Sequence, residues 1–307
     1  MTALLLIEQT LNGLQLGVML FLMAAGLTLV FGIMNMINLA HGSLYMVGAY
    51  CAALFLEWTG SFVLAALLAL PATLLVGLVV EILVLRTLYE RDHLDQVLAT
   101  FGLILFFNEA VHLVGGAEAL YLDLPPFLKG QVEIIPGSPY PIYRLVVIAV
   151  GLAVALGLYL LVTRTRTGML IRAGASNRTM LSALGVNVRL LFTAVFGLGA
   201  MLAGLGGVMA GPIVSVQSGM GENVLILAFV VIVIGGIGSV RGAFIAALLI
   251  GLIDTMGRAF MADLMGLLMS HAAAQTAGPT IASMLIYLLM AGVLFFRPQG
   301  LFPPRGR

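Results

Sequence analysis

Charged side chains are scarce in this sequence. Asp, Glu, Lys and Arg make up only 9% of its 307 residues, whereas soluble domains carry about 25%, which excludes a water-soluble surface. The formal net charge of +1 gives no reason to expect a nucleic-acid partner.

Cysteine is scarce as well. Because Cys51 is the single cysteine, an intrachain disulfide is excluded, and the side chain is expected to pack as an inert apolar group. The N-terminal stretch "MTALLLIEQTL" has no basic region and contains Glu8, which argues against a cleaved signal peptide.

Motifs for catalysis and nucleotide binding are also missing. There is no G-x-x-x-x-G-K-[ST] phosphate loop, and the single lysine, Lys129, lies in a loop expected outside the membrane. No G-x-S-x-G, H-E-x-x-H or C-x-x-C motif occurs, and the four histidines are too widely spaced to indicate a metal site. The sequence therefore predicts no enzyme activity, no metal and no cofactor bound by this chain.

Long apolar runs dominate what remains. The chain is 62% hydrophobic with a mean hydropathy of +1.15, and its apolar segments are continuous and near the ~20 residues that span a bilayer as a helix. Spans are expected at 10–32, 40–57, 62–85, 96–115, 143–163, 190–212, 224–237, 243–261 and 279–296. The prediction is an all-α polytopic membrane protein, a single domain over residues 1–307. We expect eight or nine transmembrane helices or helix segments, with broken or re-entrant elements on either side of "GGIGSVRG".

Arginines give the chain an orientation. Most of them lie in the segments 86–91, 164–189 and 297–307, and Arg241 is assigned to the same side of the membrane. If these segments are cytoplasmic, only Lys129, Arg144 and Arg258 of the fourteen basic residues lie outside, as the positive-inside rule requires. The N-terminus is then outside and the C-terminus inside, which favours nine segments and makes 117–142 an external loop.

Small residues recur at four-residue intervals, a spacing that lets helix backbones approach closely in lipid. These ladders are Ala203, Gly207 and Gly211; Ala243, Ala247 and Gly251; and Gly13 with Gly17. The expected role is helix packing, and the alternative is a hinge or a solute-lining surface.

Three acidic residues, Glu81, Glu109 and Asp254, lie within apolar segments and could form a proton relay. Glu81 and Glu109 are expected instead near membrane ends, in reach of headgroups or water.

A polar cluster, "MNMINLAHGS" at residues 34–43, interrupts the first apolar runs. On one helix, Asn35, Asn38, Gly42 and Tyr45 would form a single stripe, with His41 beside Asn38. Unsatisfied polar groups cost several kcal/mol in hydrocarbon, so this stripe must face protein or water. Two interpretations stay open: side chains that bond backbone exposed at a helix break, or the lining of a translocation path.

Several stretches carry a family resemblance. "NGLQLGVMLFLMAAGLTLVFGIMNMINLAHGSLYMVGAY" (12–50), "VIGGIGSVRGAFIAALLIG" (233–251), "TRTRTGMLIRAGASNRTMLSALGVNV" (163–188) and "RPQGLF" (297–302) are present. They resemble the permease subunits of branched-chain amino acid ABC importers, of the LivH type. The resemblance implies a bacterial inner-membrane protein that pairs with a second permease subunit, for instance of the LivM type. It also implies two cytoplasmic ATPase subunits, which bind ATP and Mg²⁺, a periplasmic solute-binding protein and surrounding membrane lipid.

The resemblance gives two segments a role. Gly235, Gly236 and Gly238 of "GGIGSVRG" are expected to break the backbone near the solute path, where glycine permits φ > 0 or close helix approach. The loop 164–189 is expected to dock onto an ATPase through a short helix. The docking residues are Arg172, Ser176, Asn177, Met180, Leu181, Leu184 and Gly185.

Within this docking helix, Ser176 or Asn177 would cap the N-terminus and Gly185 would end the helix. Met180, Leu181 and Leu184 would form its apolar face, although Thr179 and Met180 stand where the family pattern leads us to expect acidic or alanine residues. The alternative is a helix lying on the membrane surface beside anionic lipid.

The leading functional hypothesis is a permease subunit for branched-chain or other hydrophobic amino acids. A related importer of urea, short amides or aromatic acids is the nearest alternative. From other classes, an ion-coupled secondary carrier would need charged intramembrane residues, which are scarce here, and a membrane-embedded enzyme would need a nucleophile–base pair, which does not stand out.

Overall fold

The computed structural model describes residues 3–116, 118–135 and 138–302. Its long helices are α1 (Ala3–Met34), α2 (His41–Thr59), α3 (Phe62–Leu83), α4 (His93–Gly115), α5 (Ile142–Arg164), α8 (Val188–Ala210), α9 (Met220–Gly235), α10 (Val240–Met265) and α11 (His271–Phe296). The shorter elements are η1 (Leu85–Leu88), α6 (Arg166–Ser176), α7 (Arg178–Ala183), β1 (Gln131–Ile135) and β2 (Ser138–Pro141). Among the described residues, seven helices are long and apolar enough to cross a membrane, which confirms an all-helical polytopic protein.

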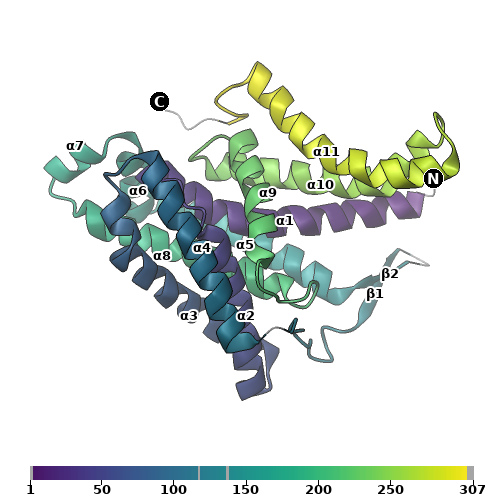
Figure 1. Ribbon diagram of the computed structural model, residues 1–307, viewed down its shortest axis with the longest axis horizontal. Helices are drawn as coiled ribbons and strands as arrows, with labels where there is room; N and C mark the ends of the chain where they lie inside the picture. Colours follow the sequence, from purple (N-terminus) through teal and green to yellow (C-terminus); the bar gives the residue numbers. More distant parts are fainter. Residues whose placement is uncertain (1–2, 117, 136–137, 303–307) are drawn as a thin grey trace.

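Helix α1 is the centre of the bundle. It packs along α8, α9 and α10 and also contacts α5, and residues 20–30 are buried throughout. Figure 1 shows α10 and α11 on one side of α1, and α2, α3, α4 and α8 on the other. It also places α6 and α7 at one end of the molecule and the β1–β2 hairpin at the opposite end.

Two of the small-residue ladders pack against each other. A β-carbon added to Gly17 of α1 would lie 2.8 Å from the carbonyl oxygen of Ala247 of α10, and one added to Gly13 would lie 2.9 Å from the Cα of Leu252. Gly251 in turn faces the backbone of Gly13 and Gly17. The ladders therefore set the backbone-to-backbone approach of α1 and α10, as small residues do at helix interfaces in membranes.

The structure corrects the expected topology in two places. The segment 117–142, expected to be a loop, contains the antiparallel β1–β2 hairpin. The proposed stripe from Asn35 to Tyr45 does not lie on one helix, because α1 ends at Met34 and α2 begins only at His41. The region 224–261, left open between one span and two, forms two separate helices, α9 and α10.

Candidate functional site

The junction between α1 and α2 is a backbone break. Asn35, at φ 51°, is the one non-glycine residue with positive φ in the described part of the chain, and its N–H donates to the Phe31 carbonyl at 3.0 Å. An asparagine in the left-handed region is a common way to end a helix. Asn35 is exposed, whereas Asn38 and His41 are completely buried.

A glutamine from another helix supports this break. Gln96 of α4 is buried, and its Oε1 accepts from the Ile37 N–H at 3.3 Å. Its Nε2 lies 3.1 Å from each of the Leu88 and Arg91 carbonyl oxygens. Gln96 thus ties the α1–α2 junction to the η1–α4 turn, a role that sequence reasoning missed. The one feature in the sequence that could have indicated this role is a polar glutamine in the first turn of a mostly apolar helix.

Asn38, His41, Gly42 and Tyr45 lie in the core of the bundle. A β-carbon on Gly26 of α1 would approach His41 Nε2 to 2.9 Å, and Tyr45 packs beside Gly206 of α8. Gly42 lies against the backbone of Gly221 in α9. The stretch therefore contacts α1, α8 and α9.

The side chains of Asn38 and His41 have no hydrogen-bond partner of normal geometry among the described residues. The backbone of Met23 approaches the His41 ring, but without the geometry of a hydrogen bond. Buried polar atoms without partners are rare because each costs about 1–3 kcal/mol. These two side chains are therefore poor candidates for simple interhelical bonding in the conformation described.

The predicted glycine break is present at the α9–α10 turn. Gly236 has φ 102° and Gly238 has φ 85°, conformations that L side chains rarely adopt. The Ser239 hydroxyl accepts from the Gly242 N–H at 3.0 Å and caps α10. A β-carbon on Gly32 of α1 would lie 2.8 Å from the Cα of Gly238, so the last turn of α1 packs on this break.

The C-terminal segment closes the same turn. The N–H groups of Leu301 and Phe302 donate to the carbonyls of Ile234 and Gly235, at 2.8 and 3.1 Å. A β-carbon on Gly236 would lie 3.0 Å from the Phe302 carbonyl oxygen. The "RPQGLF" and "GGIGSVRG" motifs, about sixty residues apart in sequence, therefore form one structural unit.

The docking segment folds as two short helices. Asn177 Oδ1 accepts from the Met180 N–H at 2.9 Å and caps α7, while Ser176 is the last residue of α6. After α7, the N–H groups of Gly185 and Val186 donate to the carbonyls of Ser182 and Leu181, with Gly185 at φ 82°. This is a Schellman ending, so both the cap and the stop lie where the sequence placed them.

The expected apolar face of α7 is divided. Met180 and Leu184 are exposed, but Leu181 is buried at 4% exposure, and its Cδ2 would contact a β-carbon on Gly174 at 3.4 Å. Gly174 of α6 also lies against Ile33 in the last turn of α1. Leu181 therefore holds α7 to the rest of the protein, and Met180 and Leu184 form the free surface. Arg172 is exposed on α6.

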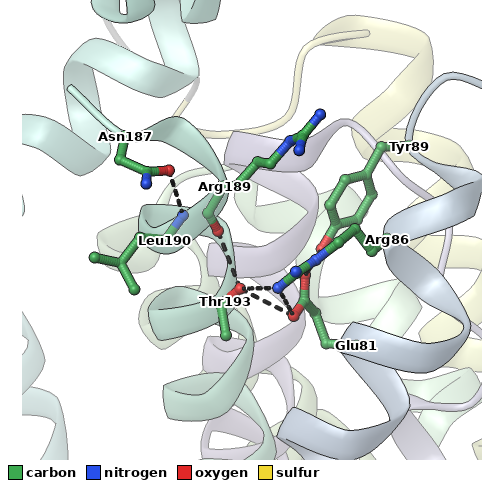
Figure 2. A network of polar contacts seen from close by, with 7 residues as sticks. All are labelled: Glu81, Arg86, Tyr89, Asn187, Arg189, Leu190 and Thr193. Carbon is green, nitrogen blue, oxygen red and sulfur yellow. Dashed lines mark hydrogen bonds and ion pairs between the residues drawn. The ribbon is translucent and has the colours of Figure 1, made fainter. Parts of the chain in front are cut away.

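A buried carboxylate lies near this segment (Figure 2). Glu81 at the end of α3 is 0% exposed, contrary to the expectation that it reaches headgroups or water. Its oxygens accept from the Tyr89 hydroxyl at 2.6 Å, the Thr193 hydroxyl at 2.9 Å and Arg86 Nη2 at 3.1 Å. Thr193 also accepts from Arg86 Nη2 at 2.9 Å. Burial, followed by the bond to Glu81, raises the pKa of Tyr89, which keeps its phenol protonated as a donor.

The Glu81 network joins α3, η1 and the first turns of α8, where Asn187 caps the helix by accepting from the Leu190 N–H at 3.1 Å (Figure 2). Glu109, by contrast, is exposed on α4. Asp254 of α10 pairs with Arg258 one turn later, at 2.9 Å. Glu81 and Asp254 thus have separate arginine partners on different helices.

A core of apolar helices with two broken junctions in contact, and a capped helical segment at one end, defines a polytopic helical membrane protein. The chain belongs to the family described as "Branched-chain amino acid transport system / permease component", whose model matches residues 9–294.

Individual relatives match over most of their length. The permease protein BraD of a high-affinity branched-chain amino acid transport system from Pseudomonas aeruginosa is 30% identical over 309 residues, 96% of this chain and 95% of the relative. LivH of Escherichia coli K12 is 30% identical over 276 residues, covering 83% of this chain and 87% of the relative. A probable LivH from Methanocaldococcus jannaschii is 27% identical over 263 residues, 81% and 80% of the two chains. No solved structure gives a significant match.

Proposed function

We propose that this chain is the membrane-spanning permease subunit of an ABC importer for branched-chain or other hydrophobic amino acids. The observation that carries the proposal is family membership over residues 9–294, together with relatives whose names specify branched-chain amino acid transport. Residues 1–307 act as one membrane domain. A related importer of urea, short amides or aromatic acids is the alternative solute class.

The driving force comes from other subunits. Because the sequence has no phosphate loop, two cytoplasmic ATPase subunits bind ATP and Mg²⁺, and this chain holds no cofactor. A second permease subunit, for instance of the LivM type, completes the pore, and a periplasmic binding protein delivers the solute. The N-terminus is outside the bacterial inner membrane and the C-terminus is cytoplasmic, an orientation supported by the arginine distribution.

The solute path is proposed to pass the contact between the two broken junctions. Asn35, Asn38, His41, Gly42 and Tyr45 border it from the α1–α2 side, and Gly235, Gly236 and Gly238 border it from the α9–α10 side. Supporting evidence is the packing of Gly32 on Gly238 and the unpartnered polar atoms of Asn38 and His41. Movement of α1 relative to the α9–α10 turn would expose these neutral polar groups to a zwitterionic solute, which a fixed charge would retain too strongly.

The ATPase is proposed to contact the α6–α7 segment. Arg172, Ser176, Met180 and Leu184 lie on or beside its free surface, while the caps at Asn177 and Gly185 and the buried Leu181 fix its shape. Because Gly174 touches Ile33 at the end of α1, a displacement of α6 is transmitted directly to the α1–α2 junction.

Reconstitution tests the function. Proteoliposomes with both permease subunits, the ATPases and the binding protein are expected to accumulate leucine, isoleucine or valine when ATP is supplied, and urea or aromatic acids serve as competing solutes. Proteoliposomes with this chain alone are the control and are expected to accumulate none of them. Uptake by the isolated chain under a proton or sodium gradient would instead identify a secondary carrier and overturn the proposal.

A further inference from the structure

A cavity of about 960 Å³ lies between α1, α5, α6 and the turn that precedes α10. Arg172 of α6 and Arg241 of α10 both line it, and no acidic residue does. Neither arginine belongs to any of the three ion pairs found among residues 3–116, 118–135 and 138–302. The Arg241 guanidinium lies 5.7 Å from the centre of the Phe302 ring. The cavity therefore has unneutralised positive charge from two separate elements.

The rest of the lining is mostly apolar, with Thr28, Tyr159, Thr163, Ser176 and Ser239 as its polar members. Phe21 and Leu29 of α1, Phe244 of α10, and Leu152 and Leu156 of α5 contribute to the lining. Leu152 and Leu156 are 47% and 60% exposed, so this chain leaves that face of α5 uncovered. The cavity is an amphipathic groove, with cationic groups near the α6 end and hydrocarbon along its length.

The dimensions of the groove match one leaflet of a bilayer. Lining residues on α1 extend from Phe21 to Ile33, twelve residues apart, which at 1.5 Å per residue is roughly 18 Å. Half of the ~30 Å hydrocarbon thickness is about 15 Å. Arg172 lies on α6, the short helix that follows α5, and Arg241 is in the first turn of α10, so both lie where the helices of one membrane face end.

We propose that this cavity binds one anionic phospholipid. Its phosphate is held by Arg172 and Arg241, and an acyl chain lies along Leu152, Leu156 and Phe21. Basic pockets between helices at the cytoplasmic face suit anionic headgroups, and the bidentate guanidinium geometry suits a phosphate. The proposal rests on the orientation given under the proposed function only for the choice of the cytoplasmic leaflet.

The bound lipid would have a mechanical effect because its two contacts belong to different moving parts. Arg172 is on α6 in the docking segment, and Arg241 directly follows the α9–α10 glycine turn. One headgroup thus bridges the part that contacts the ATPase and the part that borders the solute path. A free amino acid would occupy only a fraction of the groove and would leave its long apolar wall uncovered.

Native mass spectrometry of the full chain in detergent tests the site. Phosphatidylglycerol is the probe, phosphatidylcholine is the neutral comparison and inorganic phosphate is the headgroup comparison. Phosphatidylglycerol is expected to bind more tightly than phosphatidylcholine. Arg172→Gln and Arg241→Gln are each expected to weaken its binding about fivefold, the value of one basic residue near an anionic lipid. Both arginines are exposed, so the variants retain the fold.

Matched variants separate this site from general attraction to a basic surface. Arg164→Gln and Arg178→Gln remove exposed arginines that do not line the cavity, and are expected to leave phosphatidylglycerol binding within twofold of the unmodified chain. Leu156→Trp fills the groove and is expected to displace the lipid, whereas Leu160→Trp, on α5 but outside the lining, is expected not to.

Three results would overturn the proposal. Equal weakening by the control arginine variants would mean a nonspecific lipid belt. Binding of inorganic phosphate as tight as that of phosphatidylglycerol would identify a free anion as the ligand. Loss of the lipid when the second permease subunit is added, with crosslinks from position 156 to that subunit, would show that protein fills the groove. None of these results bears on solute uptake by the reconstituted importer, so the proposed function is tested separately.

Discussion

Removing Arg86 should destabilise the protein by leaving a buried charge without its partner. Glu81 is 0% exposed, and Arg86 Nη2, at 3.1 Å, is its one cationic partner in the described part of the chain. Removing one member of a buried ion pair costs about 3–5 kcal/mol. Because the Arg86 side chain is 37% exposed and the Tyr89 and Thr193 hydrogen bonds remain, we expect Arg86→Gln to lower the free energy of unfolding by about 2–3 kcal/mol.

A double-mutant cycle isolates the charge effect. In Glu81→Gln with Arg86→Gln, no buried charge is left unpaired, so the double variant is expected to be at least about 1 kcal/mol more stable than the sum of the two single changes predicts. The assay is unfolding in mixed bicelles by titration with dodecyl sulfate, followed by circular dichroism. The control is Arg91→Gln, which removes an exposed arginine just after η1. This expectation is wrong if the free energy of unfolding of Arg86→Gln lies within about 0.5 kcal/mol of that of the unmodified chain, or if the cycle is additive. Either result would mean that the ion pair with Arg86 does not stabilise the buried Glu81 carboxylate.

Three further predictions concern transport by the reconstituted complex. Gly236→Val should abolish transport, because the backbone at this position has φ 102° and a β-carbon would lie against the Phe302 carbonyl. Gly157→Val is the control and should transport normally, because a β-carbon at position 157 has no neighbouring atom within 4 Å. Equal losses of transport in the two variants would argue against a special role for the α9–α10 turn. Leu184 is exposed, so Leu184→Asp should uncouple ATP hydrolysis from transport without loss of stability. Leu181 is buried, so Leu181→Asp should destabilise the protein by several kcal/mol. Normal coupling in Leu184→Asp would show that the ATPase docks elsewhere. With the native cysteine replaced by alanine, Asn38→Cys should react with a water-soluble thiol reagent only when the complex cycles; no reaction in any state would place the path elsewhere.

The sequence was sufficient for features with local signals. Apolar run length gives the helices, the four-residue spacing of Gly13 and Gly17 gives the close approach to α10, and the cap at Asn177 and the stop at Gly185 follow from side-chain chemistry within one turn. Gly77 shows the limit of such signals. In the sequence it looks like an ordinary glycine within an unbroken helix, but in the structure it packs directly on Ala200 of α8 and has no room for a larger side chain.

Features that depend on distant partners could not be predicted. The burial of Glu81 is possible because Thr193, 112 residues away, and the Arg86–Tyr89 turn satisfy its oxygens. The stripe from Asn35 to Tyr45 failed because periodicity alone does not reveal a left-handed residue that ends a helix. The β1–β2 hairpin was missed because its strands are only five and four residues long and the second contains two prolines.

The bond between Leu301 and Ile234 also has a consequence for biogenesis. The carbonyls at the end of α9 are satisfied by backbone N–H groups of residues 301 and 302, which follow α11 in the chain and are therefore synthesised after α9, α10 and α11. During translation α9 and α10 can enter the membrane, but the turn between them lacks these two bonds until residues 301 and 302 have been synthesised. A chain that terminates before residue 301 therefore leaves the Ile234 and Gly235 carbonyls without these two bonds, and the α9–α10 turn stays incomplete.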